Sequence, residues 1–173
     1  MERYIPDIYQ KSIYTINYDA LKKKGIKFLM FDLDNTIVSP YANKASNKTK
    51  ELFDRLKNKG FEVVIFSNSH KTRVKPFGEA LGVEVYDNAQ KPFRENFLKV
   101  LKKHDIKPNE AAMIGDQLMT DIAGGNNAGL TTILVEPIDT KEKIYTKFNR
   151  FFERKKLKLL GRNSLFTKGK FYD

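Results

Sequence analysis

Two aspartates that follow a run of apolar residues, Asp32 and Asp34, have the types and spacing to support chemistry. Residues 27–31 contain the apolar run that is typical of a buried parallel strand, and such a strand gains nothing from a carboxylate at its end unless a site lies there. Two carboxylates at one point favour a divalent cation or a raised pKa on one of them. An Asx turn that caps the strand would explain the same residues without chemistry. The residues that follow the other predicted strands must distinguish a site from an Asx turn.

Polar side chains also follow the next two apolar runs. Ser67 and Asn68 come directly after VVIF, where a hydroxyl, an amide and backbone N–H groups could hold a phosphate. Either residue could instead be an ordinary helix cap. Lys91 precedes Pro92 and offers a fixed charge that could neutralise a phosphoryl group, although Pro92 also suits the first turn of a helix. Each of these signals is weak by itself.

A second acidic pair, Asp116 and Asp121, follows the apolar run AAMI. Asp116 occupies the position equivalent to Asp32 at the end of its strand, whereas Asp121 could be only a first-turn residue that the helix dipole favours. Carboxylates from separate strand ends are the hard oxygen ligands that Mg²⁺ takes, usually together with water and a substrate phosphate. The acidic residues therefore predict a magnesium site.

The elements that must position these side chains alternate along the chain. Apolar periodicity and turn residues predict five strands separated by helices, with the strands at 27–31, 62–66, 83–86, 111–114 and 131–135 and the helices at 17–24, 46–59, 72–81, 93–104 and 120–128. This alternation predicts an α/β fold with a central parallel sheet and helices on both faces. The carboxyl ends of the strands then meet at one edge, where ligands bind in open sheets.

Composition favours one domain over residues 1–173, with an N-terminal region at 1–26 and a C-terminal extension at 141–173. The absence of cysteine excludes disulfides and thiolate sites. His70 and His104 are far apart in the sequence, and we interpret both as surface residues. No apolar leader and no run of about 20 apolar residues is found, so we expect a soluble, cytoplasmic protein.

The net charge of +11 is uneven, because residues 141–173 carry +8 of it. Residues 141–160 have the pattern of a basic amphipathic helix with aromatic residues. Such a helix could lie on an anionic membrane surface as a peripheral contact, or pack on the sheet as an ordinary helix. A basic segment suggests an anionic partner, namely acidic lipid, nucleic acid or a phosphorylated substrate, but it could also be a solvated tail.

The motifs DLDNT, SNS, KP and GDQLMTD occur in order at four successive strand ends, and this combination resembles the haloacid dehalogenase (HAD) superfamily. The stretch GDQLMTDIAGGNNAGLTTILVEPI is similar to the YqeG-type subgroup of class IIIA phosphatases, which is related to the phosphatidylglycerophosphate phosphatases of mitochondria and plastids. The similarity covers roughly residues 5–160. It implies a Rossmann-like HAD fold, and the short intervals 35–61 and 70–90 leave no room for a cap domain.

The resemblance also implies catalytic roles. Asp32 would be the nucleophile that forms an aspartyl-phosphate, and Asp34 would be the general acid and then the general base. Lys91 would be catalytic and, with Ser67 and Asn68, would bind the substrate phosphate. The presence of Asp34 favours a phosphatase over a dehalogenase.

The same resemblance implies a Mg²⁺ cofactor. Its ligands would be the Asp32 carboxylate, the backbone carbonyl of Asp34 and Asp116, and Asp121 would order the ligands and Lys91.

The substrate is the open question, and an uncapped site suits a phosphate on something large. The leading hypothesis is a phosphatase that acts on phosphatidylglycerophosphate at the inner face of the membrane. One alternative is a soluble phosphatase for sugar or nucleotide phosphates. Another is a nucleic-acid- or ribosome-binding protein with an accessory phosphatase site.

Overall fold

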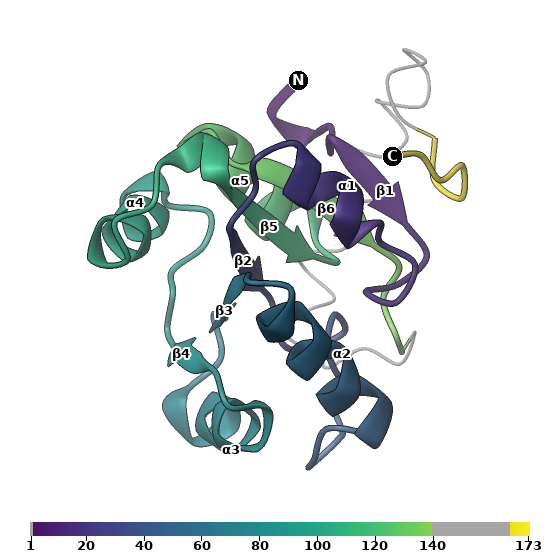
Figure 1. Ribbon diagram of the computed structural model, residues 1–173, viewed down its shortest axis with the longest axis vertical. Helices are drawn as coiled ribbons and strands as arrows, with labels where there is room; N and C mark the ends of the chain where they lie inside the picture. The colour runs from purple at the N-terminus through teal and green to yellow at the C-terminus, as the bar shows by residue number, and fades with distance from the viewer. Residues whose placement is uncertain (1, 140–166) are drawn as a thin grey trace.

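The computed structural model describes residues 2–139 and 167–173. Its centre is one six-stranded sheet in which every strand pair is parallel (Figure 1). The strands lie in the order β1-β6-β5-β2-β3-β4, with the bounds β1 Ile8–Gln10, β2 Phe28–Phe31, β3 Glu62–Phe66, β4 Glu84–Tyr86, β5 Ala111–Gly115 and β6 Thr131–Val135.

Helices connect the strands and cover the sheet on both sides (Figure 1). They are η1 Glu2–Tyr4, α1 Tyr18–Lys23, α2 Asn47–Asn58, α3 Lys71–Leu81, α4 Arg94–Lys103, η2 Pro108–Glu110, η3 Leu118–Ile122 and α5 Ala123–Ala128. The predicted parallel α/β fold with helices on both faces is therefore confirmed.

Strand β2 shows why the sheet needs two covered faces. Its residues Leu29 and Phe31 pack into a core with α1, α2 and α3, whereas Phe28 and Met30 pack into a second core with α4 and α5. All four side chains are fully buried. A strand buried on both faces has to be apolar at every position, which is the pattern that the sequence carries at 28–31, within the predicted strand at 27–31.

Two elements differ from the sequence-based prediction. Strand β1 was not predicted, because three residues are too few to show an alternating pattern, and it pairs with β6 at the sheet edge. The predicted helix at 120–128 begins instead as the short π-helical turn η3 and continues as α5.

The interpretation of His104 as a surface residue was wrong. Its side chain is mostly buried, its ring lies against Phe28, and its Nε2 lies 2.7 Å from the Tyr86 hydroxyl. His104 directly follows α4, whose apolar face packs on the sheet, and this places the histidine ring against the sheet as well.

The topology places a switch point between β2 and β5. The chain runs from β2 to β3 and β4 on one side, then crosses back to β5 on the other side of β2. Ligands bind at such switch points, beyond the carboxyl ends of the strands. The β2–β3 connection contains α2 and the β3–β4 connection contains α3, and neither contains an inserted cap domain.

The predicted basic helix at 141–160 lies outside the described residues. Residues 167–173 return to the sheet edge, where Tyr172 and Tyr9 exchange backbone hydrogen bonds of 2.9 Å in an antiparallel bridge. Within the described part of the chain, no helix is both long enough and apolar enough to cross a membrane.

Candidate active site

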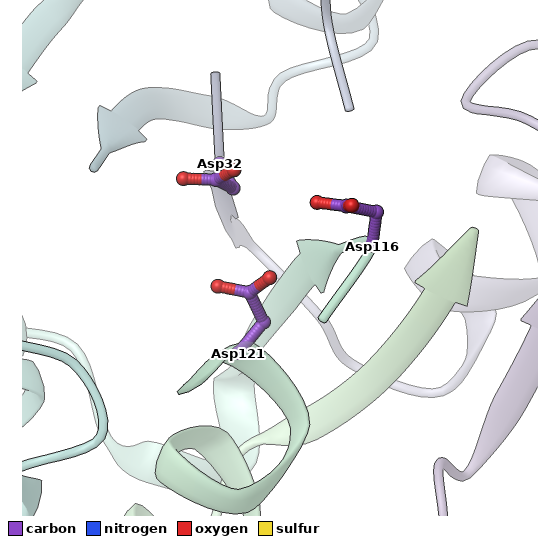
Figure 2. A group of neighbouring side chains, drawn as sticks. All are labelled: Asp32, Asp116 and Asp121. Carbon is purple, nitrogen blue, oxygen red and sulfur yellow. The ribbon is translucent and has the colours of Figure 1, made fainter. Parts of the chain in front are cut away.

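Three buried aspartates gather at the carboxyl ends of β2 and β5. Asp32 directly follows β2, Asp116 directly follows β5, and Asp121 lies in η3. One carboxylate oxygen from each lies within 4.8 Å of the others. Figure 2 shows the three carboxylates close together at the ends of their elements. The parallel sheet thus brings together residues that are up to 89 positions apart in the chain.

Lys91 supplies the positive charge inside this acidic group. Its Nζ donates hydrogen bonds to Asp32 Oδ1 at 2.7 Å and to Asp121 Oδ1 at 2.6 Å, and all three side chains are buried. Burial by itself lowers the pKa of Lys91, but Asp121 and Asp32 outweigh burial and raise the pKa above its usual value. Lys91 is therefore a permanent cation in the site.

Burial has the opposite consequence for Asp32. Loss of water raises the pKa of its carboxyl to about 6, although the charge of Lys91 acts to lower it and Asp121 adds to the rise. A buried carboxylate in such a place is poorly solvated, so a nearby positive charge favours its ionised form.

The backbone of Lys91 is held by the side chain of Asn68. The backbone N–H of Lys91 donates to Asn68 Oδ1 at 2.7 Å, and Asn68 Nδ2 donates to the Lys91 carbonyl oxygen at 3.1 Å. The predicted phosphate ligand Asn68 thus uses its amide to position Lys91. The buried hydroxyl of its neighbour Ser67 accepts the backbone N–H of Ser69 at 3.2 Å.

Asp121 is held from both sides. Its Oδ2 accepts the backbone N–H of Gln117 at 3.1 Å, while its Oδ1 accepts Lys91. Gly115 makes room for this carboxylate, because a Cβ on Gly115 would lie 2.2 Å from Asp121 Oδ2. The π-helical turn that carries Asp121 is of a kind that is frequent at functional sites.

The carboxylate of Asp34 points to a different group of residues. Arg73 Nε and Nη2 both donate to Asp34 Oδ1, at 3.1 and 2.7 Å, and Ser69 Oγ donates to Oδ2 at 2.8 Å. Arg73 also donates to the carbonyl oxygens of Ser39 and Ala42 in the loop after β2. The guanidinium therefore ties the first turn of α3 to this loop and to Asp34.

Sequence reasoning missed Arg73 and Ser69. Arg73 is one of several basic residues at and near the start of α3, and no pattern distinguishes it from Lys71 or Lys75. Ser69 was visible in the SNS motif, but its contact with Asp34 requires the turn after β3 to face the loop after β2.

The acidic group fits a divalent cation. Its three carboxylates and one ammonium carry a net charge of −2 when all are ionised, which one Mg²⁺ would balance. The donor atoms are carboxylate oxygens, the type that Mg²⁺ prefers. Thr36 Oγ1 lies 3.4 Å from Asp116 Oδ1 and orients that carboxylate from the loop after β2.

The sequence of the chain is similar to those of known phosphatases. Residues 1–139 match the family model described as "Mitochondrial PGP phosphatase". The chain is 38% identical over 159 residues to the Bacillus subtilis protein named "Probable phosphatase YqeG", and the match covers 92% of both chains. It is 29% identical to the Arabidopsis thaliana "Phosphatidylglycerophosphate phosphatase 1, chloroplastic/mitochondrial", over 80% of this chain but only 42% of the plant protein.

Solved structures show the same fold at low sequence identity. The 3-deoxy-D-manno-octulosonate 8-phosphate phosphatase of Moraxella catarrhalis, solved with magnesium ion, phosphate ion and a KDO molecule, has a TM-score of 0.56 and 18% identity. That match covers 72% of this chain and 76% of the Moraxella chain. The cobalt-bound Haemophilus influenzae phosphatase YrbI has a TM-score of 0.54 and 16% identity, over 84% of this chain and 95% of its own.

Proposed function

Because the chain belongs to the mitochondrial PGP phosphatase family and is a phosphatase of the HAD superfamily, we propose that it is a magnesium-dependent phosphomonoesterase that dephosphorylates phosphatidylglycerophosphate. The observation that carries the chemistry is the buried group in which Lys91 bridges Asp32 and Asp121 beside Asp116. The observation that points to the substrate is the family match, together with the similarity to the Arabidopsis enzyme.

Mg²⁺ would be held by the carboxylates of Asp32 and Asp116 and the backbone carbonyl of Asp34, while Asp121 orders this group and Lys91. When bound, the ion neutralises the charge of the phosphoryl oxygens. The Moraxella catarrhalis structure, which shares the fold, was solved with magnesium and phosphate ions, and this supports the choice of metal.

Asp32 is the proposed nucleophile. Its carboxylate oxygen attacks phosphorus, an O–P bond forms, and the bond between phosphorus and the alcohol oxygen of the substrate breaks, which leaves an aspartyl-phosphate. Lys91 holds Asp32 Oδ1 and so fixes the direction of the carboxylate. Lys91 and Ser67 also supply the positive charge and the hydroxyl that the phosphoryl group requires during transfer.

Asp34 is the proposed acid and base. It gives its proton to the departing alcohol oxygen and then takes a proton from the water that hydrolyses the aspartyl-phosphate. Arg73 engages Oδ1 through two N–H groups, so Oδ2 is the oxygen that carries the proton. Ser69 contacts Oδ2, and its hydroxyl can rotate from donor to acceptor as the proton moves.

A phosphate-release assay tests the reaction and the substrate together. Vesicles that contain phosphatidylglycerophosphate are compared with soluble sugar phosphates and nucleotides. We expect the lipid to be preferred, and we expect Asp32→Asn to lose turnover by several orders of magnitude while it retains the fold. Asp54→Asn, which changes an exposed aspartate of α2, is the matched control. Equal activity on all substrates would refute the lipid assignment, and turnover by Asp32→Asn or in excess EDTA would refute the mechanism.

A soluble sugar phosphate is the second candidate. The observation in its favour is 31% identity, over 46% of this chain, to the Pyrococcus furiosus "Glyceraldehyde 3-phosphate phosphatase". A clear preference for a triose or sugar phosphate in the same assay would support it.

A further inference from the structure

Three of the large apolar side chains that the structure leaves exposed share one edge of the sheet. Tyr41 is 54% exposed, Phe93 is 64% exposed and Ile138 is 52% exposed. They lie in the connections that leave the carboxyl ends of β2, β4 and β6. Because all strands are parallel, these connections emerge at the same edge as the active site.

The loops that carry these side chains are fastened to the site. Tyr41 lies in the loop whose carbonyl oxygens Arg73 binds. Phe93 follows Lys91 by two residues. The backbone N–H of Ile138 donates to the carbonyl oxygen of Asn35 at 3.1 Å, and Asn35 directly follows Asp34. The three apolar side chains therefore have defined positions near the carboxyl ends of β2 and β5.

Basic side chains accompany the apolar ones at this edge. Lys44 lies in the β2–α2 connection, and Lys71 and Arg94 begin α3 and α4; all three are exposed. The described connections at the opposite edge carry no exposed large apolar side chain. One ion pair at that edge joins Lys27 and Glu110.

The depth of the nucleophile constrains how a lipid can reach it. Asp32 and Lys91 are buried, with 5% and 6% of their surface exposed. If the substrate is a phospholipid in a bilayer, as the proposed function holds, the carboxyl edge of the sheet must face the headgroups. That edge is also the one where exposed apolar side chains and basic side chains are found together.

We infer that Tyr41, Phe93 and Ile138, with Lys44, Lys71 and Arg94, form a docking rim that seats the active site on an anionic bilayer, an inference that rests on the proposed function. Apolar side chains enter the boundary between headgroups and acyl chains, and lysine and arginine bind the anionic headgroups. The apolar side chains project from three separate connections with basic residues among them. A bilayer accommodates this arrangement, whereas a protein partner would need a continuous complementary surface.

Tryptophan fluorescence can test the rim, because the chain contains no tryptophan. Tyr41→Trp and Phe93→Trp each place one reporter on the rim, and Asn58→Trp places a control at the end of α2, on the opposite edge. With vesicles rich in phosphatidylglycerol we expect a blue shift and quenching by brominated lipid at positions 41 and 93 and neither effect at position 58. Phosphatidylcholine vesicles should give a weaker response.

An activity measurement separates this inference from the proposed function. The triple variant Tyr41→Ser/Phe93→Ser/Ile138→Ser should lose about tenfold or more of its activity on vesicle lipid, because it loses apolar burial at the membrane, and should keep its activity on a soluble phosphomonoester. Phe171→Ser removes an exposed aromatic residue near β1 and is the matched control.

The outcomes are distinguishable. If the wild-type chain hydrolyses vesicle lipid but the rim reporters do not shift, or the position 58 reporter shifts equally, the docking rim is refuted and the proposed function stands. If the triple variant keeps full activity on vesicles, the rim is likewise refuted. If the wild-type chain hydrolyses only soluble esters, the proposed lipid substrate is refuted, and the docking rim is refuted with it.

Discussion

Asp34 illustrates how a neighbouring residue can define the role of a proposed catalytic carboxylate. It lies two residues from the proposed nucleophile, yet its side chain contacts Arg73 and Ser69. Two N–H groups of one guanidinium bind Oδ1, so Oδ2, which Ser69 contacts, is the oxygen proposed for proton transfer. Arg73 is thus a positioning residue for the proposed acid.

Arg73→Ala should therefore lower kcat/KM most for substrates whose leaving oxygen must be protonated. With an alkyl phosphate, whose leaving oxygen must be protonated, we expect kcat/KM to fall by about 10²-fold, in the range of general acid contributions. With p-nitrophenyl phosphate, whose leaving group departs as the stable p-nitrophenolate anion, we expect a much smaller fall. Steady-state kinetics on both esters measure the difference.

Lys75→Ala, which changes an exposed basic residue of the same helix, is the control for this experiment. Arg73→Lys should restore activity only in part, because lysine cannot form the paired contact. An equal loss on both esters would show that Arg73 serves the fold and not the acid.

The raised pKa of Asp32 predicts how metal binding depends on pH. Burial raises the pKa of this carboxyl to about 6, so below that pH the metal-free site holds a proton that a cation must displace. Above it the proton is already lost, and affinity should level off. Mg²⁺ affinity should therefore fall by about tenfold for each pH unit below about 6.

Calorimetric titration with Mg²⁺ from about pH 5 to about pH 8 checks this dependence. Asp32→Asn carries no titrating group at this position, so its weaker binding should be flatter over the same range. Wild-type affinity that is constant below pH 6 would contradict the assignment of Asp32 as a ligand.

The turn between β5 and α5 depends on a missing side chain. Gly115 ends β5, and the carboxylate of Asp121 occupies the space that a Cβ on Gly115 would fill. Asp121 in turn accepts a hydrogen bond from Lys91. The carboxylate therefore connects the end of β5, the π-helical turn η3 and the β4–α4 connection.

Gly115→Ala should displace Asp121, with a loss of about 1–3 kcal/mol in unfolding free energy, as is typical of overpacking. It should also weaken Mg²⁺ binding, because the contact between Asp121 and Lys91 is disturbed. Chemical denaturation and metal titration measure the two effects.

Gly25→Ala provides the comparison, because a Cβ there meets no atom within 4 Å but the backbone has φ +90°. It should lose stability through backbone strain and keep its metal affinity. Unchanged metal affinity in Gly115→Ala would show that the contact between Asp121 and Lys91 tolerates the shift.

The balance of charge in the site links the metal to the stability of the entire domain. Lys91 bridges Asp32 and Asp121, and Asp116 lies beside them, so residual repulsion among the three carboxylates opposes the pairing of β2 with β5. A cation that binds only the folded chain stabilises it by mass action, by about 2.7 kcal/mol at a hundred times its Kd.

We therefore expect Mg²⁺ to raise the Tm of the protein in a concentration-dependent manner. In Asp116→Asn the Mg²⁺-dependent rise should be lost, whereas the metal-free Tm should be equal or higher because repulsion is reduced. Asp54→Asn should respond to Mg²⁺ as the wild type does. Differential scanning calorimetry at several Mg²⁺ concentrations gives the result, and an equal rise in Asp116→Asn would contradict the proposed site.

The parallel sheet, its helices and the edge that bears the site could be predicted from local patterns. A strand buried on both faces must be apolar throughout, so β2, β3 and β5 stand out in the sequence. A carboxylate directly after such a strand is unusual enough to mark Asp32 and Asp116. Strand β1 gave no such signal, because it is short and its partner β6 lies more than a hundred residues away.

Only the tertiary structure decided which polar groups contact one another. Asn68 was expected to bind phosphate, but an amide can equally bind a backbone, and here it binds that of Lys91. The partnership of Arg73 with Asp34 joins residues 39 positions apart and depends on how α3 packs beside the loop after β2. Patterns of residue type record burial and chain direction, which are local; the choice of partner depends on distances across the folded domain.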